Sequence, residues 1–230
     1  MKKKRKISHE ERDQLFHQQT AADYDQNIVK KLVAYHDVFF NPWLRKLSGG
    51  RILDYGSGTG CLIGRILPFV SKYVGIDHSK EMIEIAQKKV NSKKVKFVLG
   101  NCLKLPFENE SFDAIICQGI FHHLSDVEKG LKEVLRVSKA GADIFISEPI
   151  YPNKTLLKFK NFFRNEKQNA SVEKPLDFES LQKLLKTNKI TYKYFYSVWV
   201  PVPKFLQRII IKIWSVTRFK GDMVFVYCKK

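Results

Sequence analysis

Short apolar runs and amphipathic stretches alternate along residues 50 to 150 of this sequence. The apolar runs have the length of buried strands, and the stretches between them repeat apolar residues three and four positions apart, as helices packed on a sheet do. Such alternation predicts a doubly wound parallel sheet, which binds its ligands at the carboxyl ends of its strands. We expect strands at residues 52–53, 73–77, 95–99, 112–117 and 142–148, and helices at 60–68, 79–90 and 126–138.

Further elements are predicted on either side of this alternating region. Ser8 and Glu11 have the spacing of a capping box and begin a predicted helix over residues 8–19. A second helix is predicted from Asp25 to Phe40, and Asn41-Pro42 is expected to break it, because the residue before a proline disfavours helical geometry. After Pro149 we expect helices at 154–164, 177–187 and 203–220, and strands at 191–200 and 223–228.

The loop after the first strand is rich in glycine. Residues 54–60 read Asp-Tyr-Gly-Ser-Gly-Thr-Gly, and glycines at alternate positions let the chain turn into a helix while its amides stay open to a ligand. A dinucleotide fingerprint, G-x-G-x-x-G, would need glycine at 61 or 63, where Cys61 and Ile63 stand. A phosphate-binding loop would need a Gly-Lys-Ser/Thr triplet, and none follows. The loop therefore favours a cofactor of another kind.

The form of this loop, together with Asp77 at the end of the second strand, resembles the class I S-adenosylmethionine-dependent methyltransferases. The resemblance covers about residues 20–150. It is nearest to the small-molecule subgroup that includes the ubiquinone and menaquinone C-methyltransferases, which carry a methyltransferase type 11 domain. Three further segments are similar to that family: Leu105-Pro106-Phe107, Phe121 to Asp126, and Ser147-Glu148-Pro149.

The resemblance implies an α/β fold with a Rossmann-like, doubly wound, seven-stranded sheet, an antiparallel C-terminal strand pair and an N-terminal helical cover. A chain of 230 residues can bury one substantial core, so we expect a single domain with small additions. Its parts are a basic tail and helical cap at 1–47, a cofactor-binding core at 48–150, and acceptor-side helices with the last two strands at 151–230.

The resemblance also implies S-adenosyl-L-methionine as cofactor and a set of residues that hold it. The Asp54 carboxylate would orient the methionine amino group through water, and Asp77 would accept hydrogen bonds from both ribose hydroxyls. Asn101 stands where the family commonly has an acid that accepts from the adenine amino group, and its amide oxygen can accept one bond without charge. The predicted cofactor-binding residues are Tyr24, Asp54, Gly56, Gly58, Gly60, Asp77, His78, Asn101, Cys102 and Gln118.

Other members of this set have simpler expected roles. Tyr24 would close over the cofactor, His78 would pack beside the adenine, and Cys102 would contribute its backbone amide. Gln118, with Gly119, sits where the family's backbone meets the methionine. Structural alternatives remain open: Asp54 could stabilise the loop, Asp77 could be a solvated acid at a strand end, and His78 could be an exposed loop residue.

His122 and His123 are the candidate catalytic residues, because the pKa of histidine lies near working pH. Glu148 is a further candidate acid. The alternative is that these histidines are structural, since methyl transfer from a sulfonium can proceed through in-line positioning without a dedicated base. No metal site is predicted, because the four cysteines show neither C-x-x-C spacing nor neighbouring histidines. The same pattern argues against a disulfide framework and favours the cytoplasm.

The formal charge of +18 is unevenly distributed. Residues 7–153 hold nineteen Lys or Arg against eighteen Asp or Glu, whereas residues 154–221 hold fifteen against four. The sequence shows no apolar run of membrane-spanning length and no apolar signal region after the basic residues 2–6. We therefore expect the cofactor-binding part to be near neutral and the acceptor-binding part to be basic.

The predicted helix from Pro203 to Lys220 has two contrasting faces. Its cationic face and Trp214 at the boundary suit an interfacial helix on an anionic membrane, which would make the protein peripheral there. The alternative is that the apolar face docks on the sheet and the lysines are solvated. Nucleic acid is the weaker rival partner, since the aromatic residues at 192–199 suit a strand better than base stacking. The broad apolar face holds Phe205, Leu206, Ile209, Ile210, Ile213 and Trp214, and the opposite face Lys204, Arg208 and Lys212.

The function that these features favour is transfer of a methyl group to a small, lipidic or hydrophobic acceptor. One alternative is an RNA or protein methyltransferase that binds its macromolecule through the basic last third. A second is a protein that binds the cofactor without catalysis. The sequence leaves the acceptor atom and the oligomeric state open, since carbon, nitrogen and oxygen nucleophiles share this cofactor fold.

Overall fold

The computed structural model describes residue 25 and residues 30–47, 49–150, 176–197, 204–217, 221 and 223–230. The helices predicted at 8–19 and 154–164 lie outside these residues, as does the predicted site residue Tyr24. The same holds for residues 198–200 of a predicted strand and for both ends of the helix predicted at 203–220.

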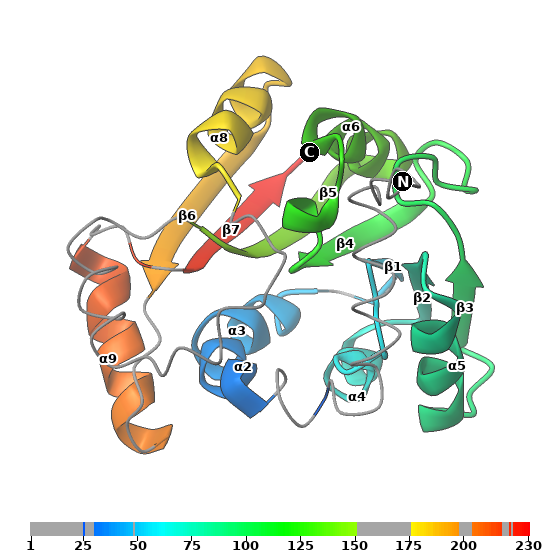
Figure 1. Ribbon diagram of the computed structural model, residues 1–230, viewed down its shortest axis with the longest axis horizontal. Helices are drawn as coiled ribbons and strands as arrows, with labels where there is room; N and C mark the ends of the chain where they lie inside the picture. The colour runs from blue at the N-terminus through cyan, green and yellow to red at the C-terminus, as the bar shows by residue number, and fades with distance from the viewer. Residues whose placement is uncertain are drawn as a thin grey trace, which may run out of the picture.

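Seven strands form one sheet in the order β3-β2-β1-β4-β5-β7-β6 (Figure 1). β1 to β5 run parallel, and β7 lies antiparallel between β5 and β6. This arrangement confirms the predicted Rossmann-like fold with an antiparallel C-terminal pair. The strands are β1 (Arg51–Tyr55), β2 (Lys72–Asp77), β3 (Val95–Leu99), β4 (Phe112–Gln118), β5 (Ser138–Pro149), β6 (Thr191–Ser197) and β7 (Met223–Lys229).

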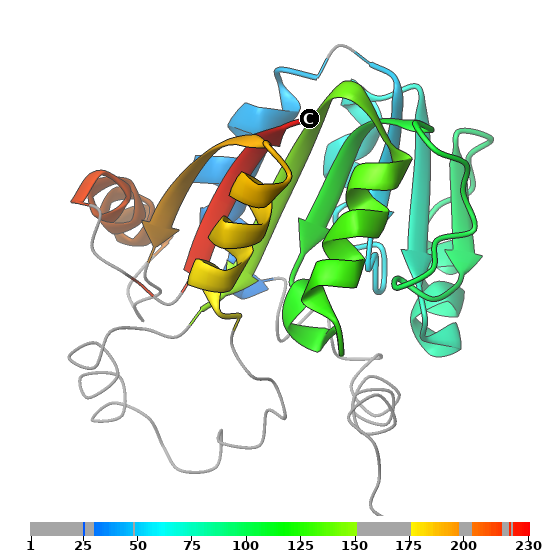
Figure 2. The same ribbon diagram turned by 90° about the horizontal axis from the view of Figure 1, so that it is seen from above.

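Helices cover both faces of the sheet. Figure 1 shows α6 and α8 on one face and α2, α3, α4, α5 and α9 on the other, and Figure 2 shows α6 and α8 lying side by side along the strands. The predicted helix at 60–68 is a short α-helix followed by a 3-10 turn. The helices are α2 (Lys30–Tyr35), η2 (His36–Phe40), α3 (Asn41–Leu44), α4 (Ile63–Ile66), η3 (Leu67–Phe69), α5 (Lys80–Lys89), η4 (Phe121–His123), α6 (Val127–Val137), α8 (Phe178–Thr187) and α9 (Lys204–Thr217).

Two apolar clusters, one on each face, form the core. Leu53 and Ile115 belong to the cluster under α6 and α8, whereas Ile52 and Ile116 belong to the cluster under α2 and α3. Successive residues of β1 and β4 thus point to opposite faces, and both faces are buried. This is why these strands read as continuous apolar runs rather than as alternating patterns.

The cover helix does not break at Pro42. η2 is a π-helix, and the Asn41 backbone N–H donates to His36 O, five residues earlier, before α3 continues through Pro42. The prediction of a helix end at Asn41-Pro42 is therefore wrong. A proline cannot donate to the carbonyl four residues before it and clashes with it, and the wider π turn relieves that conflict.

Several large apolar side chains of α9 are exposed, whereas Ile211 is fully buried. The side chains that dock α9 are Gln207 and Ile211, which are buried, and Arg208 forms an ion pair with Asp37 of η2. The helix lies at the β6 edge against α2, and Ile211 belongs to the core cluster under α2 and α3. Contact of the remaining apolar side chains with a membrane stays a prediction. The outward apolar residues are Leu206, Ile209, Ile213 and Val216, which are 39%, 51%, 60% and 76% exposed.

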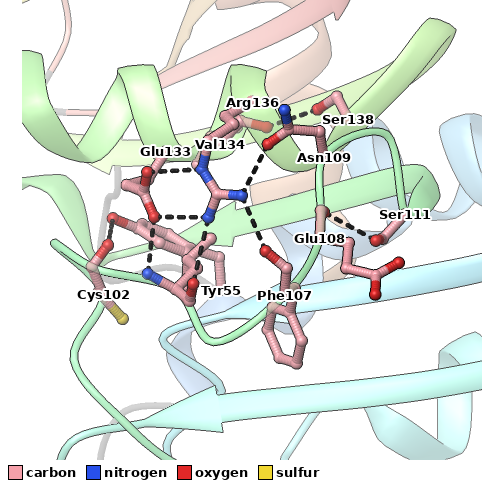
Figure 3. A network of polar contacts seen from close by, with 11 residues as sticks. Tyr55, Cys102, Phe107, Glu108, Asn109, Ser111, Glu133, Val134, Arg136 and Ser138 are labelled. Atoms are coloured by element: carbon pink, nitrogen blue, oxygen red, sulfur yellow. Dashed lines mark hydrogen bonds and ion pairs between the residues drawn. The ribbon is translucent and has the colours of Figure 1, made fainter.

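Arg136 of α6 ties down the loop that carries the Leu-Pro-Phe segment (Figure 3). Its guanidinium donates to the carbonyl oxygens of Leu105 and Phe107 at 3.1 and 2.8 Å, and it is paired with Glu133. Glu133 in turn accepts the Leu105 N–H at 2.7 Å. This bidentate arrangement fixes residues 105–107 against α6, so the loop after β3 is held by side chains rather than by a strand.

None of the helices in the described part of the chain reaches the length and hydropathy that crossing a bilayer requires. The same residues hold no cluster of three or more His, Cys, Asp or Glu arranged to bind a metal. All four cysteines, which lie in that part, are free thiols.

Candidate functional site

The glycine loop leaves β1 in a conformation that only glycine adopts readily. Gly56, Gly58 and Gly60 have φ angles of +76°, +50° and +68°. The backbone N–H groups of Gly56 and Ser57 both donate to Ile76 O at 2.9 Å. The loop is therefore bound to the carboxyl end of β2, the neighbouring strand.

The glycines of this loop differ in what a side chain would meet. A Cβ on Gly56 would lie 2.6 Å from the Ile120 side chain, so that glycine is required by packing. A Cβ on Gly58 would meet none of the described residues within 4 Å. Gly58 thus borders open space at the carboxyl edge of the sheet, and a ligand could approach its backbone closely.

Asp77 at the end of β2 faces the same loop. Its Oδ2 accepts the Gly58 N–H at 2.8 Å, and its Oδ1 accepts the Ser79 N–H at 2.9 Å. His78 Nδ1 lies 3.7 Å from Oδ1. Each carboxylate oxygen has a second lone pair, so Asp77 can still accept from a vicinal diol while it holds the loop. Its binding to a ribose stays a prediction.

Asp54, the last residue but one of β1, is buried beneath the loop. Its Oδ2 accepts a hydrogen bond from the Tyr73 hydroxyl at 2.6 Å. Burial raises the pKa of Asp54 to about 7; the Tyr73 hydrogen bond opposes that shift and the charge of Asp77 adds to it. A cation near Asp54 would favour its ionised form, which fits the predicted role beside an amino group without testing it.

Residues after β3 form local hydrogen bonds, and their predicted contacts with adenine stay predictions. Asn101 is exposed, and its Oδ1 accepts the Leu103 N–H at 2.7 Å in a local turn. The Cys102 carbonyl accepts from the Tyr55 hydroxyl at 2.9 Å, and burial raises the pKa of its thiol. The Asn101 oxygen has one lone pair left for an adenine amino group.

Gln118, the last residue of β4, contacts a histidine that the sequence reasoning missed. Gln118 Oε1 lies 3.0 Å from His36 Nε2, which reaches it from η2. His36 is buried, and its Nδ1 has no hydrogen-bond partner among the residues that the structure describes. Burial lowers the pKa of His36 to about 4, although the Gln118 hydrogen bond opposes that shift. In the sequence, His36 could have been noticed only as a polar residue on the apolar face of the predicted cover helix.

Glu148 and His122 are brought together at the ends of β5 and β4. Glu148 is fully buried; its Oε1 accepts the N–H groups of Ile120 and Phe121 at 2.8 and 2.9 Å, and its Oε2 lies 2.6 Å from His122 Nδ1. The His123 ring centroid is 4.0 Å from that of His122. The structure thus brings into contact Glu148 and His122, which the sequence analysis predicted as separate candidates.

The described site residues follow the carboxyl ends of four neighbouring strands. The glycine loop follows β1, Asp77 and His78 close β2, and Asn101 and Cys102 follow β3. Gln118 ends β4, and the two candidate catalytic histidines form η4 just after it. This edge is where parallel α/β sheets bind ligands.

Comparison with known proteins gives a family match inside this region. Residues 53–146 match the family model described as a methyltransferase domain. The chain is 32% identical over 147 residues to the uncharacterized methyltransferase YcgJ of Bacillus subtilis strain 168, which covers 62% of this chain and 58% of that protein. It is 33% identical over 118 residues to the demethylmenaquinone methyltransferase of Roseiflexus sp. strain RS-1, covering 50% of each.

The chain thus spans little more than half the length of these curated relatives. Among solved structures, it is similar in fold to the plantazolicin methyltransferase BpumL, solved in complex with a monoazolic desmethylPZN analogue and SAH. That likeness has a TM-score of 0.63 at 19% identity and covers 93% of this chain and 89% of the other. At this identity it supports the fold.

Proposed function

Because residues 53–146 belong to the methyltransferase domain family, we propose that this chain is an enzyme that transfers a methyl group from S-adenosylmethionine to a small hydrophobic acceptor. The observation that carries the proposal is the glycine loop, which is bound to Asp77 and leaves open space over Gly58. Support for the cofactor comes from the SAH in the structure of the plantazolicin methyltransferase.

The residues of the loop fit this cofactor. Asp77 would accept from the ribose hydroxyls, the Gly58 backbone would border the amino-acid chain, and an ionised Asp54 would favour its ammonium group. When bound, the cofactor supplies a methyl group on a sulfonium, which is a good leaving group. The chain's own task is then to align an acceptor with that methyl group and to exclude water.

For the acceptor, we propose an aromatic compound related to a demethylated quinol. Several relatives carry the name demethylmenaquinone methyltransferase, including the one from Roseiflexus described above. Acceptors of this class are lipidic, so the enzyme would work close to a membrane.

α9 is the part of the molecule that we propose meets that membrane. Its outward residues Leu206, Ile209, Ile213 and Val216, called here the α9 apolar face, are exposed, and Lys212 beside them is exposed as well. An exposed aliphatic face with flanking cations is what binding to an anionic lipid surface requires. The protein would then be cytoplasmic and peripheral on the membrane.

A methyl-labelling experiment tests the proposed function. Purified protein is incubated with methyl-labelled S-adenosylmethionine and cell extract, which is then separated into lipid, RNA and protein. We expect the label in the lipid fraction and on reduced demethylmenaquinone added as a defined acceptor. Label in RNA or protein would favour the macromolecular alternative, and cofactor binding without any transfer would favour a non-catalytic protein.

A further inference from the structure

We propose that Glu148 is a positioning residue for methyl transfer, because it holds His122 in the tautomer whose Nε2 accepts the proton that the acceptor loses. This inference rests on the proposed function and deepens it. It assigns the acceptor to compounds whose reacting group carries an acidic hydrogen, such as the hydroxyl of a phenol or hydroquinone.

The hydrogen bonds of Glu148 define its state. Its side chain is fully buried, and Oε1 accepts two backbone N–H groups, from Ile120 and Phe121. Oε2 is 2.6 Å from His122 Nδ1. Two backbone N–H groups that donate to one oxygen favour the carboxylate form, which accepts at every oxygen, so we assign the proton of this short contact to Nδ1 of the imidazole.

The tautomer of His122 follows from that contact. When Nδ1 carries the proton, Nε2 of the neutral ring carries the lone pair. The negative charge of Glu148 next to the ring also favours the imidazolium that forms when Nε2 takes a proton. The titratable side chains that the structure shows against the ring are Glu148 on β5 and the neighbouring His123.

The turn that carries His122 lies beside the glycine loop. Gly119 has a φ of +64°, its N–H donates to Ser147 O at 2.8 Å, and a Cβ there would lie 3.7 Å from His122 Cε1. One residue later, Ile120 packs directly over Gly56. The imidazole therefore lies next to Gly119, in the turn that carries Ile120 onto the glycine loop.

The proton and electron pairs balance as follows. His122 Nε2 takes the proton from the acceptor hydroxyl, and the O–H electron pair stays on the acceptor. That pair forms the new bond to the methyl carbon, at oxygen or, after delocalisation, at a ring carbon, while the S–C bond breaks and its pair stays on sulfur. For a ring carbon, loss of its C–H proton to solvent and return of the His122 proton to oxygen restore the aromatic hydroxyl. One proton is released overall.

A purely structural role for Glu148 would require only that it accept the two backbone N–H groups, without control of the His122 tautomer. Capping the N–H groups of Ile120 and Phe121 needs only a neutral acceptor, which a glutamine supplies through its amide oxygen. The Glu148→Gln variant keeps those bonds but presents an N–H₂ donor to His122 Nδ1. The ring must then accept at Nδ1 and carry its proton on Nε2, the wrong tautomer for a base.

The experiment compares wild type with Glu148→Gln by two readouts. In ¹⁵N-histidine NMR spectra, we expect His122 to carry its proton on Nδ1 in the wild type and on Nε2 in the variant. With reduced demethylmenaquinone as acceptor, we expect kcat to fall about 10²- to 10⁴-fold while KM and SAH affinity are unchanged. The matched control is Glu128→Gln, which alters an exposed carboxylate on α6 paired with Lys132 and should keep kcat.

An unchanged His122 tautomer or an unchanged kcat in Glu148→Gln would overturn the proposal. If that variant does not fold, His122→Gln replaces it, since Glu148 then keeps its backbone bonds, and retained kcat would again overturn the proposal. If the wild type binds SAH but does not methylate the quinol, the proposed acceptor is wrong. The tautomer measurement still decides in that case whether Glu148 positions the ring.

Discussion

The Tyr73 hydroxyl donates a 2.6 Å hydrogen bond to Asp54 Oδ2 between two neighbouring strands of the sheet, β2 and β1. Both side chains are buried, and burial raises the pKa of Asp54 to about 7. The carboxyl group of Asp54, two residues before the first glycine of the loop, therefore changes its charge near neutral pH. This affects both folding and ligand binding.

The first prediction concerns stability against pH. The pKa of Asp54 is near 3.9 in the unfolded chain and about 7 in the folded one, so between these values the folded state binds more protons. The Asp54 contribution to stability therefore falls as pH rises from about 4 to about 7, by up to roughly 1 kcal/mol per pH unit. The free energy of unfolding, measured with urea at several pH values, should fall less with rising pH in Asp54→Asn than in wild type.

Two variants sharpen that measurement. Tyr73→Phe removes the hydrogen bond that favours the ionised form of Asp54. The pKa of Asp54 should therefore rise, and the pH range over which stability falls should extend to higher pH. Asp143→Asn removes an exposed carboxylate paired with Lys229 and serves as control. If Asp54→Asn and Asp143→Asn have the same pH profile as wild type, Asp54 is ionised throughout and its raised pKa is wrong.

His36 should act in the opposite direction. Burial lowers its pKa from 6.5 to about 4, so the unfolded state binds more protons between these values. The free energy of unfolding should therefore decrease as pH falls from about 6.5 to about 4, and the decrease should be smaller in His36→Asn than in wild type. The measurement is the urea midpoint across that range, and an identical acid sensitivity in His36→Asn would contradict the prediction.

The glycine loop offers a pair of matched alanine substitutions. Gly58 and Gly141 have φ angles of +50° and +75°, and a Cβ at either position would meet no atom of the described part of the chain within 4 Å. Each Gly→Ala change should cost about 1 kcal/mol of stability from backbone strain. Calorimetric titration with SAH should show affinity reduced about tenfold or more in Gly58→Ala alone. Equal affinity in both variants would place the cofactor away from Gly58.

Asp77→Asn tests the other half of the cofactor site. An asparagine can accept one of the two backbone N–H groups that Asp77 holds, but it lacks the charge and one acceptor oxygen. SAH binding should weaken by about 1.5–3 kcal/mol, the value of a hydrogen bond to a charged group. Asp143→Asn again provides the control, and unchanged SAH binding by Asp77→Asn would remove Asp77 from the site.

The α9 apolar face can be tested with vesicles. Wild type should float with phosphatidylglycerol vesicles at low salt, and Ile209→Ser with Ile213→Ser should reduce the bound fraction, because each buried side chain contributes about 1.5–3 kcal/mol. Leu99→Ser removes an equally exposed apolar residue on β3 and should float as wild type does. Flotation unaffected by the α9 changes, or equally reduced by Leu99→Ser, would contradict the proposed membrane contact.

The sequence predicted the centre of the sheet well because its central strands are buried on both faces. Runs such as 112–117 and 73–77 have no plausible place except inside a sheet, and the structure has strands there. The spacing of the glycine loop separated a methyltransferase from a dinucleotide-binding protein, and the family match confirms that resemblance. Features that depend on the residue pattern within one strand or loop could therefore be predicted from the sequence.

Features that depend on contacts between segments far apart in the sequence could not be predicted from it. The end predicted at Pro42 ignored the π turn, which needs a whole helix packed on the sheet to hold it. The direction in which α9 faces depends on the docking of Gln207 and Ile211 and on the ion pair of Arg208 with Asp37, far away in the sequence. The contacts of Glu148 with His122 and of His36 with Gln118 likewise arise only once β4, β5 and η2 are assembled.

The position of β7 sets an order of events during synthesis. β6 precedes β7 in the chain, yet it joins the sheet only through β7, which lies between it and β5. On a ribosome, β1 to β5 can pair as they emerge, whereas β6 must wait until β7 has been made and inserted. Until then, the β5 edge is open to pairing with another chain, so a stalled or shortened product is a candidate for aggregation.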